Sequence, residues 1–155
     1  MTKDRRGFHY ALDPVLKKTE WEMNDLFQDL AEHNAKVNQQ QLKVDSLDQA
    51  IASARMELMK QRQHAAIINI DAQRMAHNYL LQIQRQQKEE SIQLQELIAT
   101  RDEVQLKLNE VRKFVDNLEK NKEAVGNEFD QDAAKKEYQL SDDNWLQRMH
   151  WRKST

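Results

Sequence analysis

The stretch LKKTEWEMNDLFQDLAEHNAKVNQQQLKVDSLDQAIASARMELMKQRQHA, residues 16–65, decides the fold. Every seventh residue of this stretch is apolar, in the series Leu16, Met23, Leu30, Val37, Val44, Ile51, Leu58 and Ala65. A companion series from Leu12 to Gln61 is apolar at half of its positions. An apolar repeat of seven residues with two seam positions is typical of a coiled-coil helix. The sequence therefore predicts one long helix over residues 14–65.

The start of this helix has its own signal. Asp13 suits the N-cap because its carboxylate accepts hydrogen bonds from free amides. Pro14 suits the first helical position, where the missing N–H would have no partner anyway. Residues 1–13 then form a basic arm ahead of the helix.

A second seam runs through residues 76–129, and three quarters of its positions are apolar. Its phase is displaced by one residue from that of the first seam, which is uncommon within one straight helix. A reversal of the chain within residues 66–75 explains the displacement. The predicted fold is therefore all-α: a long antiparallel two-helix coiled-coil hairpin, followed by a less regular C-terminal tail over residues 130–155.

Such a hairpin also predicts which positions face each other. Most layers are apolar on both sides when Leu16 faces Val125. The same pairing places Thr19 opposite Lys122 and Gln40 opposite Arg101. These two polar layers would fix the register.

Composition excludes several classes of protein. The chain has 155 residues, a net charge of −2, two glycines, one proline and no cysteine. So few turn residues argue against sheets, barrels and Gly-rich phosphate loops. The mean hydropathy of −0.97 predicts no membrane span, and the N-terminus lacks the apolar segment of a secretory signal. The near-neutral net charge provides no overall electrostatic attraction to nucleic acid, so we expect no nucleic acid partner. We expect a cytoplasmic protein.

No catalytic cluster stands out. The histidines lack metal-ligand spacing, and a two-helix fold offers almost no concave surface for a small molecule. We therefore expect no enzymatic activity, no metal and no cofactor.

Three features suggest partner binding. The first is the apolar tip, because a loop that only connects two helices does not need exposed apolar side chains. The second is basic charge at the start of the first helix, and the third is a tail that combines tryptophan with arginine, two residue types favoured at interfaces. Each could instead be a packed or solvated end of the hairpin. The candidate tip residues are Ile67, Ile68, Ile70, Arg74, Met75 and Tyr79, and the candidate base residues are Lys17, Lys18, Trp21, Arg148, Trp151 and Arg152.

Three segments together resemble the FliJ family, the stalk proteins of bacterial type III export ATPases in flagella and virulence injectisomes. They are FHYALDPVLKKTEWEMNDLFQDLAE at residues 8–32, INIDAQRMAHNYLLQIQRQ at residues 68–86 and LQRMHWRK at residues 146–153. The size, the absence of cysteine and the two seams also fit this family.

The resemblance implies a function and partners. It implies a central stalk that promotes assembly of a hexameric export ATPase ring and couples the ring to the cytoplasmic domain of the export gate, with export chaperones as further partners. The base would dock in the ring and the tip on the gate, at the cytoplasmic side of the inner membrane. The alternatives are a structural homodimeric coiled-coil tether, a rotor-type stalk subunit of a rotary ATPase, and an RNA-binding protein with a basic tail.

Overall fold

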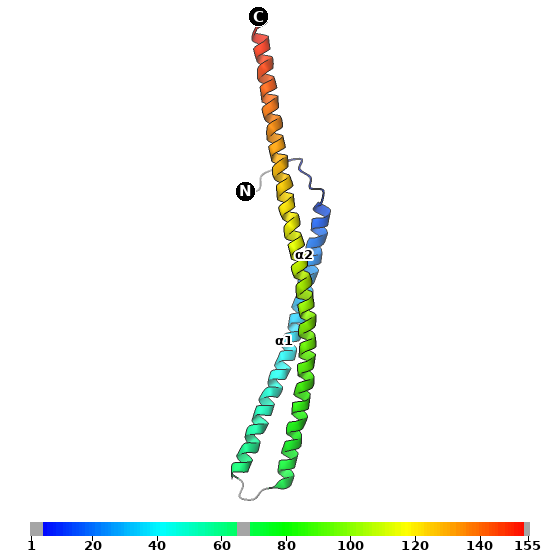
Figure 1. Cartoon of the computed structure of the whole chain (residues 1–155), viewed down its shortest axis with the longest axis vertical. Helices are drawn as coiled ribbons and strands as arrows, with labels where there is room; N and C mark the ends of the chain where they lie inside the picture. The colour runs from blue at the N-terminus through cyan, green and yellow to red at the C-terminus, as the bar shows by residue number, and fades with distance from the viewer. Residues whose placement is uncertain (1–4, 65–68, 154–155) are drawn as a thin grey trace. The chain divides into compact units, whose positions relative to one another are not determined.

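The chain folds into two long helices that pack against each other, as drawn in Figure 1. A computed structural model describes residues 5–64 and 69–153. Helix α1 spans Asp13–His64 and helix α2 spans Ile70–Lys153. The prediction of an all-α fold built from two long helices is confirmed.

Helix α2 begins earlier than the seam predicts. Asn69 is its N-cap: the side-chain Oδ1 accepts a hydrogen bond from the amide of Ala72 at 3.1 Å. The residues from Ile70 to Met75 are therefore helical, and the predicted turn over residues 66–75 is wrong for this part. Ile67 and Ile68 lie outside the described residues.

The C-terminal tail is also helical, so the prediction of a less regular tail is wrong. Helix α2 continues without interruption from residue 130 to Lys153. The loss of the seam after Phe129 marks the end of packing against a partner helix, which is a different property from helicity. Residues 130–153 contain neither Gly nor Pro, and their Lys, Glu, Gln, Leu and Ala residues lose little rotamer freedom in a helix.

The chain divides into two compact units. The first combines Met1–Asn24 with Asn109–Thr155, and the second is Asp25–Leu108. In the first unit, Leu16 packs with Val115 and Leu118, and Met23 lies against this cluster. In the second unit, Val37 and Val44 pack with Leu94, and Leu97 and Ile98 flank them.

Gln40 is a polar side chain buried within the second unit. Its side-chain amide donates hydrogen bonds to the backbone carbonyl of Glu90 at 3.0 Å and to the Glu90 carboxylate. Burying an amide is unfavourable unless it is hydrogen-bonded, so this contact favours one alignment of the two helices. Nearby, Gln87 donates a hydrogen bond to Asp48 at 3.0 Å.

The predicted seam is the core. Among the described residues, all but one of the buried side chains occupy predicted seam positions, and the exception is Tyr10. The buried seam residues are Leu16, Thr19, Val37, Gln40, Val44, Ile83, Leu94, Leu108, Val115 and Leu118.

The predicted pairing of layers is wrong by about one heptad. Leu16 packs with Val115 and Leu118 in place of Val125. Lys122 contacts Asp13 in place of Thr19, and Gln40 contacts Glu90 in place of Arg101. Sliding one helix by seven residues keeps the same residues on the seam, so the heptad pattern cannot distinguish the two pairings.

Leu108 and Leu106 provide a matched test of the seam. Leu108 is only 3% exposed, whereas Leu106, two positions earlier in α2, is 64% exposed. We expect Leu108→Ala to lower the free energy of unfolding by about 2–4 kcal/mol, toward the lower end because two helices bury a seam incompletely. Leu106→Ala should change it by less than about 0.5 kcal/mol. Urea unfolding followed by circular dichroism measures both, and equal effects would remove Leu108 from the core.

Candidate partner-binding surfaces

The end of α1 and the start of α2 carry exposed apolar side chains, and both belong to the second unit. Three predicted tip residues of α2, Ile70, Met75 and Tyr79, are all more than half exposed. The guanidinium of Arg74, the fourth, lies 3.6 Å from the Asp71 carboxylate, and both side chains are largely exposed.

Two further apolar residues at the end of α1 escaped the sequence analysis. Met56 and Met59 are exposed and lie outside the seam series. Methionine is flexible and polarisable, and it is common on adaptable binding surfaces. The signal for them was available in the sequence, since apolar residues off the seam have no helix partner to cover them. We refer to Met56, Met59, Ile70, Met75 and Tyr79 as the distal surface.

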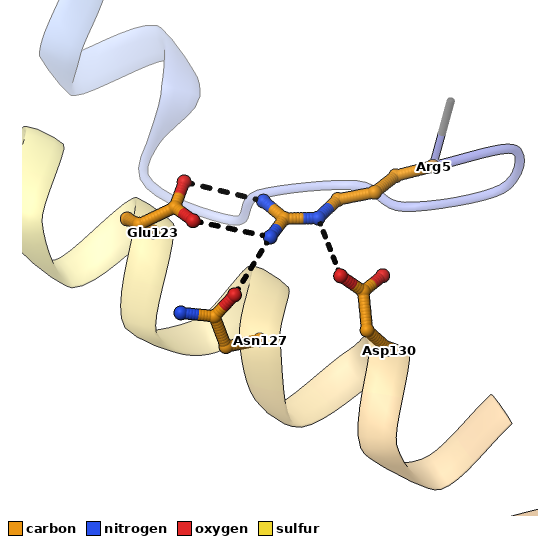
Figure 2. A network of polar contacts seen from close by, with 4 residues as sticks. All are labelled: Arg5, Glu123, Asn127 and Asp130. Atoms are coloured by element: carbon orange, nitrogen blue, oxygen red, sulfur yellow. Dashed lines mark hydrogen bonds and ion pairs between the residues drawn. The ribbon is translucent and has the colours of Figure 1, made fainter. Parts of the chain in front are cut away.

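In the first unit the N-terminal segment packs on α2. We call residues 5–12 the strap. The Arg5 guanidinium donates hydrogen bonds to Glu123, to Asn127 and to Asp130, with the shortest at 2.9 Å to the Asn127 side chain (Figure 2). The three acceptors lie on successive turns of α2, so one planar guanidinium joins the strap to two turns of helix.

Gly126 makes room for this guanidinium. Gly126 is buried, and a Cβ placed there would lie 2.2 Å from the Arg5 Nη1 atom. Any side chain at this position would displace Arg5 from its acceptors. The glycine inside a long helix therefore has a packing reason, although glycine is a poor helix former.

The strap reaches this position through a turn. Gly7 has a φ of +85°, and the Phe8 amide donates to the Arg5 carbonyl at 3.1 Å. Glycine adopts a positive φ without the steric penalty that other residues meet. The centroid of the Phe8 ring then lies 5.6 Å from the centroid of the Phe129 ring.

Tyr10 and Asp13 complete the contact with α2. The Tyr10 hydroxyl donates to the Leu118 carbonyl at 3.3 Å, and it lies 2.8 Å from the Asn121 side-chain oxygen. The Lys122 ammonium lies over the Tyr10 ring and donates to Asp13 at 2.7 Å. Hydrogen bonds from Lys122 and then from Lys17 lower the pKa of Asp13. Hydrogen bonds to Glu123 and then Asp130 raise the pKa of Arg5.

The strap is not predicted from the sequence, which indicates a basic arm over residues 1–13 with a solvated end as the alternative. The predicted pairing hid the need for a strap, because it set Leu16 opposite Val125. In the observed pairing, Val125 and Phe129 lie past the residues that face the start of α1, and the Phe8 ring lies beside Phe129.

The predicted base residues occupy two separate places within the first unit. Lys17 pairs with Asp13 at 3.2 Å, while Lys18 and Trp21 are exposed on α1. Arg148, Trp151 and Arg152 are exposed on α2, beyond the strap contacts. Leu16 packs beside Leu118, and about 45 Å of helix separates Leu118 from Arg148 at 1.5 Å per residue. The structure does not gather these six residues into one site.

The described residues show no group of three or more His, Cys, Asp or Glu side chains that could hold a metal ion. Neither described helix has a stretch long and apolar enough to cross a membrane. No family model, no characterised protein and no solved structure matches this sequence.

The contact between Arg5 and Gly126 can be tested by a double-mutant cycle. Alanine is favoured over glycine inside a helix by about 0.5–1 kcal/mol. We expect Gly126→Ala to give this gain in an Arg5→Ala background. With Arg5 present the gain should be smaller or reversed, because the new methyl group displaces the guanidinium. Thermal or urea unfolding measures the four proteins, and equal gains in the two backgrounds would contradict the close approach of Arg5 to Gly126.

The lowered pKa of Asp13 predicts how stability depends on pH. Its ordinary pKa is 3.8, and the folded state lowers it. The stabilisation is therefore complete above the ordinary value and is lost as the pH falls through the lowered one. Between about pH 5 and about pH 2, the wild-type protein should lose more thermal stability than Asp13→Asn. Parallel loss in both proteins would show that Asp13 does not contribute.

Proposed function

We propose that this protein is a non-enzymatic stalk and coupling protein of a type III export ATPase, either flagellar or of a virulence secretion system. In this proposal the chain is an antiparallel two-helix coiled-coil hairpin, and one copy, a monomer as an intramolecular hairpin, forms the stalk. It promotes assembly of the hexameric ATPase ring and links the ring to the cytoplasmic domain of the export gate, at the cytoplasmic side of the inner membrane. Export chaperones are possible further partners.

The observation that carries the proposal is the packing of α1 on α2 within a single chain. In the first unit, Asp13 bonds Lys122 while the later residue Leu16 packs with the earlier residues Val115 and Leu118. In the second unit, Gln40 bonds Glu90 while the later residue Asp48 bonds the earlier residue Gln87. In each unit the two segments run in opposite directions. A chain whose two helices cover one another needs no second copy to bury its seam.

This packing also separates the proposal from its first alternative, a parallel homodimeric tether. A parallel dimer would pair α1 with α1 and would leave the buried amide of Gln40 opposite a second glutamine in place of Glu90. The contacts of Gln40 and Lys122 within one chain favour the hairpin.

The two ends of the helices have different chemistry, which suits two different partners. The distal surface is apolar, and burying two or three such side chains could contribute a few kcal/mol at roughly 25 cal/mol per Å². That supports weak docking on the export gate. The start of α1 presents Lys18 and Trp21, both exposed, and this pairing of a basic side chain with tryptophan suits docking in the ATPase ring.

Paired variants test the two ends. We expect Ile70→Asp with Met75→Asp to weaken binding to the export gate and to leave stimulation of the ATPase unchanged, because both side chains are exposed and make no core contact. Lys18→Glu with Trp21→Ala should weaken ATPase stimulation and leave gate binding unchanged. Pull-down against the gate domain and a phosphate-release assay measure the two properties.

The controls are helicity and a second exposed apolar site. Leu42 is 70% exposed on α1, away from both helix ends, so Leu42→Asp should change neither property. If the distal variant lost ATPase stimulation and kept gate binding, the assignment of the two ends would be reversed. If the wild-type protein bound neither the ATPase nor the gate, the proposed function would be wrong.

A further inference from the structure

The last part of α2 is a helix without a covered face. All residues from 131 to 152 are exposed, and they follow the strap contacts that end this part of the packing at Asp130. We call residues 131–152 the tail segment. Its exposed side chains include Tyr138 at 75% and Trp145 at 59%. Large apolar side chains along one exposed helix indicate a surface that is covered by something else.

Three of these side chains lie on one face of the helix. Tyr138, Trp145 and Met149 are spaced by seven and then four residues, which brings them into one line along an α-helix. Asp142 and Arg152 share this face, and Arg148 borders it at three residues from Trp145. At 100° per residue, the stripe of Tyr138, Trp145 and Met149 lies roughly half a turn away from seam residue Leu118. It is therefore a second apolar surface of α2 and does not continue the seam.

The charges of the tail segment divide into two halves. Residues 137–143 contain three acidic residues, Glu137, Asp142 and Asp143, and no Lys or Arg. Residues 144–152 contain Arg148 and Arg152 and no acidic residue. The boundary between the halves lies next to Trp145, near the centre of the apolar stripe.

We infer that the tail segment pairs with the tail segment of a second copy of this chain, in antiparallel orientation. An antiparallel arrangement centred near Trp145 places Asp142, the acidic residue on this face, opposite the part of the other copy that carries Arg148 and Arg152. A parallel arrangement would place like charges together, which is repulsive. Such a twofold contact uses the same surface on both copies, the commonest symmetry among soluble oligomers.

The contact is small, so the dimer is weak. An overlap from residue 137 to residue 152 is about 24 Å of helix, with two aromatic residues and one methionine from each copy. The buried area is on the order of 1,000 Å² in total, at the low end for a specific interface. We expect a dimer that forms at about 100 µM protein, dissociates at about 1 µM and weakens with added salt, because its ion pairs are exposed.

Charge reversal in one half at a time tests the pairing in the full-length protein. A basic-tail variant carries Asp142→Lys, and an acidic-tail variant carries Arg148→Glu and Arg152→Glu. Sedimentation equilibrium should show that each variant alone dimerises at least tenfold more weakly than wild type. A one-to-one mixture should regain dimers, because each copy then offers the charge that the other lacks. Trp145→Ala should weaken both the wild-type dimer and the mixed dimer.

The control changes the same charge on α2 outside the tail segment. Lys113 and Lys120 are exposed, and Lys113→Glu with Lys120→Glu should leave dimerisation unchanged. Helicity by circular dichroism should be equal in all variants. A wild-type protein that stays monomeric at several hundred micromolar would overturn the inference. A mixture of folded variants that does not pair would also overturn it.

A vesicle-binding assay together with sedimentation separates a second copy of the chain from a membrane as the occupant of the stripe. A monomeric protein that bound anionic phosphatidylserine vesicles, and lost this binding in the acidic-tail variant, would assign the stripe to a membrane surface and overturn the inference. Sedimentation of the purified protein involves neither the ATPase nor the export gate, so the dimer and the proposed function can fail independently of each other.

Discussion

The structure depends on the burial of one apolar seam between α1 and α2. Outside that seam both helices are polar along most of their surface, so the seam is the face on which α1 and α2 fold against each other. No third layer closes over the seam in the described part of the chain, and no large side chain there is less than 2% exposed; the most buried are Leu108 and Val115, at 3% and 4%. The hydrophobic effect holds the two helices together, but it discriminates poorly among alignments of α1 along α2, because each apolar layer resembles the next.

Polar contacts supply the discrimination that the seam lacks. The hydrogen bonds from the Gln40 side chain to Glu90 fix the alignment of the helices in the second unit, because a shift would leave a buried amide without its acceptors. In the first unit, the same effect comes from the hydrogen bond of Lys122 to Asp13 and from those of Arg5 to its three acceptors. The strap also covers α2 beyond the start of α1. The distal surface and the tail segment remain exposed, and the proposals about binding rest in part on these side chains.

The sequence predicts the elements and the core of this fold, because a period of seven identifies which residues face a partner. Residues such as Leu16, Val44 and Leu94 are buried as predicted. The alignment was not predictable in the same way, since a shift of seven residues preserves the pattern. The strap joins Arg5 to residues more than a hundred positions away, and no local rule reports such a contact. The helical tail was missed because the end of the seam was taken for the end of the helix. Of the candidate surfaces, Ile70, Met75 and Tyr79 are exposed as predicted, whereas Met56 and Met59 were not predicted, although apolar residues off the seam are a signal in the sequence.

The pairing of α1 with α2 inside one chain can be measured directly with two spin labels. The chain has no cysteine, so Asp48→Cys with Gln87→Cys gives a uniquely labelled pair at two positions whose side chains are in contact at 3.0 Å. Pulsed electron paramagnetic resonance should place the two spin labels within about 20 Å of each other, since packed helix axes lie about 8–10 Å apart. The distance should persist after dilution with unlabelled protein. A separation on the order of 60 Å, as in one continuous helix, or a short distance that disappears on dilution, would contradict the account.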